Sequence, residues 1–313
     1  MNRILDVAPL AMLFALAGCN ANVAESDAPP AGFSAELRCG QLPIKVTGEG
    51  EQLMLDVHGK QLTLQQQVSA SGARYVAEGE TETSLWFKGD QASLVLEGTE
   101  YPRCAPTSAI IEPFRASGNE PFWSLTLDGG EMRLDRLNGG KLPAQRYVVG
   151  DNAGEYRSEG EPPLRLQVRD ELCRDDMSGM PHPQRVTLEV DSTTLTGCGG
   201  DPARLLQGGE WVVEDINGGG IIDRSRVTLN FWQDGRVSGR ASCNNLMGQY
   251  QLSGEGLSIG QLGTTRMACP PSLMEQEQRV LSTLEQLQRF DFDDTGALLL
   301  HSKQGTLKAR LEH

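Results

Sequence analysis

Residues 84–96 read SLWFKGDQASLVL, and this stretch decides the fold prediction. Two short runs with many apolar residues flank a turn at Gly89, which is typical of neighbouring antiparallel strands. Similar alternating runs occur at 52–57 and 61–66, again separated by Gly-containing turns. The pattern of residues 36–106 therefore predicts a small antiparallel β-barrel or sandwich.

The composition favours several small domains over one large α/β core. Only 38% of the 313 residues are hydrophobic, and 36 are glycine. Strand-like runs continue after the first barrel at 122–127, 132–137, 164–168, 185–190, 227–231, 236–241 and 297–301. We therefore expect a mainly β chain with a middle β domain of unknown function at 110–204 and a third, α+β domain at 205–313.

The charge of the chain limits its partners. Acidic residues number 42 against 28 basic ones, which gives a net charge of -14. Such a surface repels phosphate backbones and anionic lipid headgroups. We expect no nucleic-acid partner, and a positively charged protein partner is favoured.

One helix is expected in the C-terminal domain. Residues 272–275, Ser-Leu-Met-Glu, fit a capping box that follows two prolines. Four apolar residues then fall on one helical face: Val280, Leu281, Leu284 and Leu287. We expect this face to cover the last sheet, and a helix that binds a partner is the alternative.

The N-terminus has the features of an exported protein. After Arg3, an apolar run at 7–17 is about half as long as a membrane-spanning helix needs to be, so residues 1–18 are predicted to be a signal peptide. The sequence Leu-Ala-Gly-Cys at 16–19 resembles the lipobox of bacterial lipoproteins. This resemblance implies cleavage before Cys19 and acylation of its sulfur, and the alternative is a buried thiol.

The residues after Cys19 indicate a tether. Residues 19–35 are rich in Ala, Asp, Glu and Pro, and they contain too little apolar surface to fold alone. Asn20 stands where an aspartate would resemble the signal for retention in the inner membrane. We therefore expect a lipid anchor at Cys19 that holds the protein on the periplasmic side of the outer membrane.

The remaining cysteines indicate disulfides. Leaving Cys19 aside, six are present, and in an exported protein an even number predicts disulfide bonds. If each domain holds two cysteines, the pairs are Cys39 with Cys104, Cys173 with Cys198, and Cys243 with Cys269. A zinc site is the alternative, but no Cys-x-x-Cys motif occurs and the four histidines are scattered.

Motifs for catalysis or cofactor binding are missing from the sequence. No nucleophile elbow, zinc-protease motif or phosphate-binding glycine loop occurs. Asp291 and Asp293 resemble the start of a calcium loop, but a tight turn is the better explanation because position twelve is Ser302. We expect a binding protein rather than an enzyme, with no cofactor and no metal.

Two motifs in the first domain resemble the MliC family of membrane-bound inhibitors of c-type lysozyme. They are Ser-Gly-Ala-Arg-Tyr at 71–75 and Leu-Trp-Phe-Lys-Gly-Asp-Gln-Ala at 85–92, followed by Cys104. The resemblance implies a barrel tied by a disulfide, whose Ser71 and Lys88 enter the lysozyme cleft. It also places three neighbours in the lysozyme-binding site: Gly72, Tyr75 and Gly89.

The chemistry of this pair suits a glycosidase cleft. Lysozyme uses two carboxyl groups, one protonated and one ionised, and a lysine ammonium can reach between them. The Ser71 hydroxyl can donate or accept a hydrogen bond beside the Lys88 ammonium. Taken singly, both residues would be ordinary solvated turn residues. The sequence departs from the family in Leu85, which replaces an aromatic residue, and in a longer linker with three glutamates at 78, 80 and 82.

The C-terminal domain resembles the META domain of HslJ-type heat-shock lipoproteins. The resemblance covers about 205–310 and rests on motifs at 211–218, 235–250 and 264–275. It implies a sheet packed with a helix and a protective role in the envelope, without catalytic residues. Four polar residues could form a site: Asn244, Asn245, Thr265 and Arg266. A structural role is favoured, because Asn and Gly cluster at turns for backbone reasons.

The middle domain resembles a region of uncharacterised bacterial lipoproteins, which implies no activity. Its acidic residues Glu120, Asp175 and Asp176 could pair for acid–base chemistry, but a solvated loop is the favoured interpretation.

The leading functional hypothesis is an outer-membrane lipoprotein that inhibits c-type lysozyme through Ser71 and Lys88 and protects peptidoglycan. One alternative is an envelope-stress or assembly factor that acts through the META and middle domains without inhibiting lysozyme. An envelope hydrolase that uses the middle domain is a third.

Overall fold

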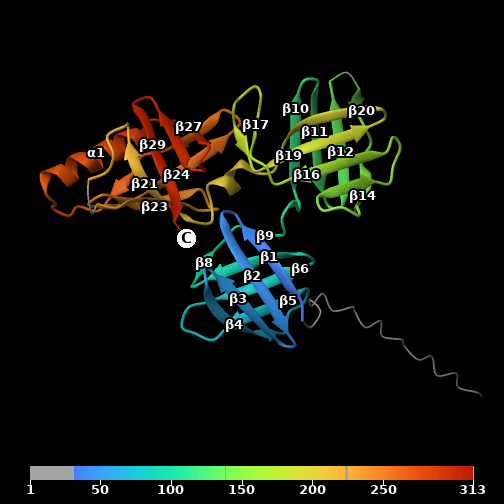
Figure 1. Cartoon of the computed structure of the whole chain (residues 1–313), viewed down its shortest axis with the longest axis horizontal. Coiled ribbons are helices and arrows are strands. Elements are labelled where there is room, and N and C mark those ends of the chain that lie inside the picture. The colour runs from blue at the N-terminus through green and yellow to red at the C-terminus, as the bar shows by residue number, and fades with distance from the viewer. Residues whose placement is uncertain (1–31, 138, 223–224, 313) are drawn as a thin grey trace, which may run out of the picture.

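The structure is a computed structural model that describes residues 32–137, 139–222 and 225–312. The predicted signal peptide, the Cys19 anchor and most of the tether lie outside the described residues. Three β-rich units are visible in Figure 1: a blue-to-teal barrel below, a green-to-yellow one at upper right and an orange-to-red one at upper left. The prediction of a mainly β fold is confirmed. In the described part of the chain, no helix has both the length and the apolar character needed to cross a membrane.

The first barrel is one antiparallel sheet that closes on itself. Its strands are β1 (Ser34–Cys39), β2 (Leu42–Glu49), β3 (Gln52–Val57), β4 (Lys60–Gln67), β5 (Ala73–Ala77), β6 (Ser84–Lys88), β7 (Gln91–Leu96), β8 (Thr99–Glu100) and β9 (Cys104–Ala105). The order is β6-β5-β4-β3-β2-β1-β9-β7-β8, and pairing of β6 with β7 closes the barrel. Alternate residues point inward, so leucines such as Leu53, Leu64 and Leu85 are fully buried.

The middle barrel has the same closed form. Its strands are β10 (Phe114–Asn119), β11 (Phe122–Asp128), β12 (Glu131–Arg136), β13 (Gly140–Lys141), β14 (Gln145–Val149), β15 (Glu155–Ser158), β16 (Leu164–Arg169), β19 (Gln184–Val190) and β20 (Thr193–Gly199). Pairing of β11 with β12 closes the sheet. A separate hairpin of β17 (Cys173–Arg174) and β18 (Pro181–His182) extends from it.

The C-terminal unit combines a sheet with a helix. It contains the short helix η1 (Pro202–Leu205), β21 (Glu210–Ile216), β22 (Val227–Phe231), β23 (Arg236–Ala241), β24 (Asn245–Ser253), β25 (Gly256–Ile259), β26 (Gly263–Thr264), α1 (Pro271–Glu285), β27 (Leu287–Phe292), β28 (Leu298–Ser302) and β29 (Gly305–Glu312). The main strand order is β25-β24-β23-β22-β21-β29-β28-β27, and β26 pairs with β24.

The expected helix covers this sheet, but it starts differently from the prediction. Val280 and Leu284 are fully buried in the core of the unit, as expected. The predicted capping box is wrong: the N-cap is Pro270, which makes no side-chain cap, and Ser272 already lies inside the helix. Proline suits the first helical turn because its missing N–H would have no partner there. Leu287 lies beyond the helix and begins β27.

All three predicted disulfides are present. Bonds join Cys39 to Cys104, Cys173 to Cys198, and Cys243 to Cys269. Each one closes a loop within a single unit, and such cross-links compensate for thin hydrophobic cores.

The first barrel contacts the C-terminal unit through its β1–β2 turn. The backbone N–H of Gln41 donates to the carbonyl of Gln207 at 2.8 Å. The side-chain amide of Gln41 donates to the carbonyl of Arg204 at 3.1 Å. These bonds connect the two units directly.

The β17–β18 hairpin connects the middle barrel to the C-terminal unit. The Arg174 guanidinium donates to the Asp291 carboxylate at 2.9 Å and to the carbonyl of Phe292 at 2.7 Å. Met180, beside β18, is only 6% exposed and packs into the C-terminal core. The Cys173–Cys198 disulfide ties this hairpin to β20 of its own barrel.

Candidate functional site

Ser71 and Lys88 lie close together on the first barrel. Ser71 is in the turn before β5, and Lys88 ends β6, the neighbouring strand. The indole N–H of Trp86 donates to the backbone carbonyl of Ser71 at 2.9 Å, which connects the turn to β6. The two motifs therefore meet at one end of the β5–β6 pair.

Local hydrogen bonds and one glycine fix the Ser71 turn. The Ser69 hydroxyl donates to the carbonyls of Ser71, at 3.2 Å, and Gly72, at 2.8 Å. Gly72 has a φ of +67°, and a Cβ there would overlap the carbonyl oxygen of Phe87. Only glycine fits this position. The Ser71 side chain is exposed, and its hydroxyl has no hydrogen-bond partner among the described residues.

The Lys88 ammonium is exposed and forms no ion pair with a described carboxylate. Its Nζ lies 4.2 Å from the centroid of the Trp86 ring. At an exposed site this cation–π contact contributes about 0.5–1 kcal/mol, so it orients the side chain without holding it firmly. A partner that offers a carboxylate can therefore draw the ammonium away from the ring.

Of the other predicted site residues, Gly89 lies at the surface and Tyr75 lies in the barrel core. Gly89 lies in the two-residue turn between β6 and β7 and has a φ of +64°. The Tyr75 side chain is only 2% exposed, and its ring packs edge-on against Phe87 inside the barrel. Tyr75 therefore supports the strands beneath the site from within the core.

The glutamate-rich loop lies at the opposite end of the same strands. It joins β5 to β6 between Ala77 and Ser84, whereas Ser71 and Lys88 flank the other ends. At about 3.3 Å per residue, five-residue strands separate the two ends by roughly 15 Å. The longer loop of this chain therefore lies away from the Ser71–Lys88 pair.

The three glutamates of this loop are not equivalent. The Glu82 carboxylate accepts hydrogen bonds from Arg74, at 2.9 Å, and from the Ser84 hydroxyl, at 2.9 Å. Glu78 and Glu80 are exposed and have no ion pair or hydrogen bond with a described side chain. Two of the three charges are thus free to act on solvent and partners.

The polar residues of the C-terminal unit form a buried cluster. Asn244 is 2% exposed, and its backbone and side-chain N–H groups donate to the Glu277 carboxylate at 2.7 and 2.9 Å. The Asn244 side-chain oxygen accepts from the Thr265 hydroxyl at 2.9 Å and from the backbone of Met267 at 2.7 Å. Because this cluster satisfies its own polar groups in the interior, it has a structural role.

Sequence reasoning missed Glu277, the centre of this cluster. Glu277 lies three and seven residues before Val280 and Leu284, on the buried face of α1. A carboxylate on the apolar face of the predicted helix was the signal that could have indicated a buried polar residue. Asn245 reaches the cluster through its backbone N–H, which donates to the Thr265 hydroxyl at 3.1 Å, whereas the Arg266 side chain is exposed.

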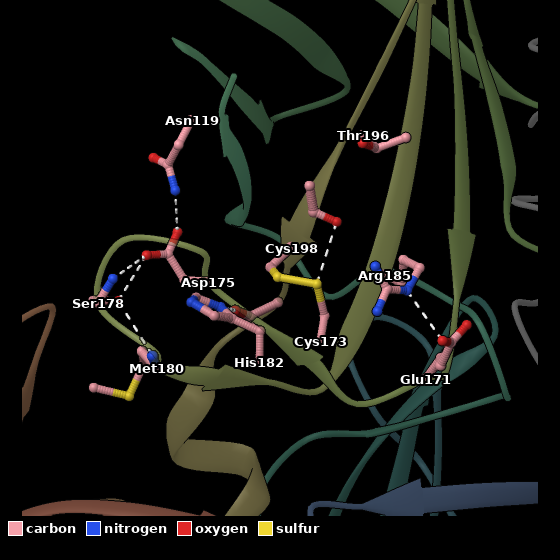
Figure 2. The surroundings of a disulfide bond; sticks show 12 residues. Asn119, Glu171, Cys173, Asp175, Ser178, Met180, His182, Arg185, Thr196 and Cys198 are labelled. Atoms are coloured by element: carbon pink, nitrogen blue, oxygen red, sulfur yellow. Dashed lines mark hydrogen bonds and ion pairs between the residues drawn. A yellow bond between two sulfur atoms is a disulfide. The ribbon is translucent and has the colours of Figure 1, made fainter. Parts of the chain in front are cut away.

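In the middle unit, Asp175 organises the β17–β18 hairpin. Figure 2 shows its carboxylate facing Asn119, whose amide donates to it at 2.9 Å, and the Ser178 turn. Burial alone would raise the pKa of Asp175, but hydrogen bonds from these donors lower it below its ordinary value. The side chain is therefore an ionised turn carboxylate, unsuited to donate a proton. Glu120 is exposed, in keeping with a solvated loop.

The described residues contain no group of three or more His, Cys, Asp or Glu side chains placed to hold a metal ion. Asp293, which began the calcium-like stretch, accepts hydrogen bonds from Thr295 and from the backbone of Ala297. These contacts confirm the predicted tight turn.

Solved structures that are similar to part of this chain include two determined by NMR. An NMR structure of a protein from Burkholderia xenovorans is 28% identical, covering 35% of this chain and 86% of its own, with a TM-score of 0.30. A second NMR structure is also 28% identical and covers 35% of this chain and 93% of its own, with a TM-score of 0.31. No curated protein matches the chain.

Comparisons with protein families give two matches at separate places. The family described as "Membrane-bound lysozyme-inhibitor of c-type lysozyme", MliC, matches residues 38–102. The family described as "META domain" matches residues 204–313. The exposed pair of Ser71 and Lys88 lies in the first match, and the buried polar cluster lies in the second. The chain therefore carries an MliC domain followed by a META domain, in the order that the sequence motifs predict.

Proposed function

We propose that this protein inhibits c-type lysozyme by placing Lys88 and Ser71 in the enzyme's active-site cleft. The observation that carries the proposal is the exposed, unpaired Lys88 ammonium, held beside the Ser71 turn in a domain that matches a family of lysozyme inhibitors.

The chemistry of the cleft matches these two groups. A c-type lysozyme cleaves with one protonated and one ionised carboxyl group. The Lys88 ammonium, drawn off the Trp86 ring, lies between them and donates to both. The Ser71 hydroxyl, which has no described partner, donates or accepts at the edge of the same pair. Because both carboxyl groups are engaged, the enzyme loses its acid and its nucleophile together.

Inhibition is measured with the purified chain from residue 20 onward and a hen-type lysozyme, in a cell-wall lysis assay. The expected result is inhibition that saturates at one inhibitor per enzyme. If the folded chain inhibits none of a panel of c-type lysozymes, the proposal is wrong.

The proposed location is the periplasmic side of the outer membrane, with Cys19 as the lipid-bearing residue. The lipobox-like residues 16–19 support the anchor, Asn20 supports the outer membrane, and the matched inhibitor family is described as membrane-bound. Replacing Cys19 with alanine is expected to yield unprocessed or soluble protein, measured by cell fractionation. Normal recovery of this variant in the outer membrane would overturn the anchor.

An envelope-stress or assembly role is the second candidate. It is favoured by the META match over residues 204–313 and by the β17–β18 hairpin, which docks the middle barrel onto that unit. A deletion strain that is sensitive to envelope stress, and rescued by the Lys88→Ala protein, would support this role.

A further inference from the structure

Lys88 lines a hollow that the first barrel shares with the middle barrel. The hollow has a volume of about 360 Å³. The first barrel contributes residues of the β6–β7 hairpin, including Trp86, Lys88 and Asp90. Glu112, Tyr147 and Val149 belong to the middle unit and form the facing wall. The middle barrel thus stands directly beside the proposed inhibitory lysine.

Hydrogen bonds hold this wall next to the Lys88 hairpin. The Gln91 side-chain amide, just after the turn, donates to the carbonyl of Ile110 at 3.0 Å. The backbone N–H of Ile110 in turn donates to the hydroxyl of Tyr156 at 3.0 Å. The hairpin is therefore joined, through one linker residue, to the inside of the middle barrel.

Hydrogen bonds within the middle unit position the residues of this wall. The Tyr147 hydroxyl donates to the Glu112 carboxylate, which also accepts from the backbone of Gly129 at 2.9 Å and of Gly130 at 3.3 Å. Burial and the nearby carboxylate raise the pKa of Tyr147, so its hydroxyl stays protonated and keeps donating.

Val149 is the exposed apolar residue of this wall. It ends β14, two positions after Tyr147, so both side chains lie on the same face of the strand. Its exposed fraction is 71%, although it lies at the mouth of the hollow. Val148 lies on the opposite face and is 47% exposed, and it does not line the hollow.

We infer that Val149 and the Tyr147 ring form a second contact surface for c-type lysozyme, at the rim of its cleft. The inference rests on the proposed function. A stable protein complex covers about 800 Å² on each partner, which is more than the tips of two turns can offer. An enzyme that receives Lys88 therefore extends over the adjoining wall. The charged side chains around the hollow have both signs, Asp90 and Glu112 against Lys88 and Arg103, so the wall adds an apolar contact rather than a net charge.

The test introduces the same cation on either face of β14. Val149→Arg places a large positive side chain in the wall, whereas Val148→Arg adds it on the other face as the matched control. Inhibition constants are measured in the full chain against one c-type lysozyme, together with Lys88→Ala, and circular dichroism checks folding. We expect Val149→Arg to weaken inhibition at least tenfold and Val148→Arg to leave it within about twofold. A milder variant, Val149→Ala, is expected to weaken it less.

The outcomes separate this inference from the proposed function. If Val149→Arg inhibits as well as Val148→Arg while Lys88→Ala loses inhibition, the second surface is wrong and the proposed function stands. Stronger inhibition by Val149→Arg would mean that the wall obstructs the enzyme, and would also overturn the inference. If the parent does not inhibit, both proposals fail.

Discussion

The polar pair of the MliC domain and the polar cluster of the META domain use similar residues in opposite ways. Ser71 and Lys88 are exposed, and their side-chain polar groups have no hydrogen-bond or ion-pair partner among the described residues. Asn244 and Glu277 are buried, hydrogen-bond each other, and leave the Asn244 oxygen to Thr265 and Met267. Residue type alone does not distinguish a binding site from an internal support; exposure and unused hydrogen-bonding capacity do.

This difference predicts that the two regions respond in different measurements. Changes at the exposed pair should alter inhibition and leave stability unchanged. Changes in the buried cluster should lower stability and leave the inhibition by the remaining folded protein unchanged. A change at Ser71, Lys88, Asn244 or Glu277 that moved both quantities together would break the comparison.

The largest effect is expected from Lys88→Ala. Removing a charge that is desolvated between two carboxyl groups costs about 2–5 kcal/mol of binding free energy. The inhibition constant should therefore rise at least tenfold. The unfolding free energy should change by no more than about 1 kcal/mol, because only the contact with Trp86 is lost. Undiminished inhibition by a folded Lys88→Ala protein would refute the inhibitory role of this residue.

The next largest effect is expected from Glu277→Ala, in stability. Two N–H groups of Asn244 would lose their acceptor in the interior, and each unsatisfied donor costs about 1–3 kcal/mol. Chemical denaturation should show a loss of at least about 2 kcal/mol for the C-terminal unit. Glu275→Ala is the control, because this exposed glutamate lies on the same helix. Equal stabilities of the two variants would argue against a supporting role for the cluster.

A smaller effect is expected from Ser71→Ala. A neutral hydroxyl contributes a weaker hydrogen bond than an ammonium, so inhibition should weaken by about 1–2 kcal/mol, with stability unchanged. Ser69→Ala sharpens the comparison. Its hydroxyl holds the Ser71 turn through two carbonyls, so this change should also lower stability slightly. A Ser71→Ala protein that lost stability would place Ser71 among the supports of the turn.

The local parts of this molecule could be predicted from sequence. Runs of alternating apolar and polar residues place β3, β22 and β23 at the bounds that the structure has. One cysteine pair per unit gives the three disulfides. The meeting of Ser71 and Lys88 could be expected only from the family resemblance.

The remaining features depend on contacts between distant segments. The β17–β18 hairpin inserts Met180 into the core of another unit, and no local pattern indicates this. The wall at Val149 lies about sixty residues from Lys88 in sequence. The burial of Tyr75 could have been predicted, because Tyr75 lies two residues after Ala73 and therefore on the same face of β5. Its place in a binding motif suggested a surface role instead.

The smallest effect is expected from reversing Glu78 and Glu80 to lysine while leaving Glu82, which pairs with Arg74. These charges lie roughly 15 Å from Lys88, beyond the screening length of about 8 Å at physiological salt. At about 0.01 M salt the screening length is near 30 Å, so the acidic loop can there attract a basic enzyme during approach. The double variant should therefore associate several-fold more slowly at low salt and nearly normally at physiological salt, with dissociation unchanged, as measured by surface plasmon resonance. Faster dissociation would mean that the loop touches the enzyme, and the contact surface would then extend to both ends of the β5–β6 pair.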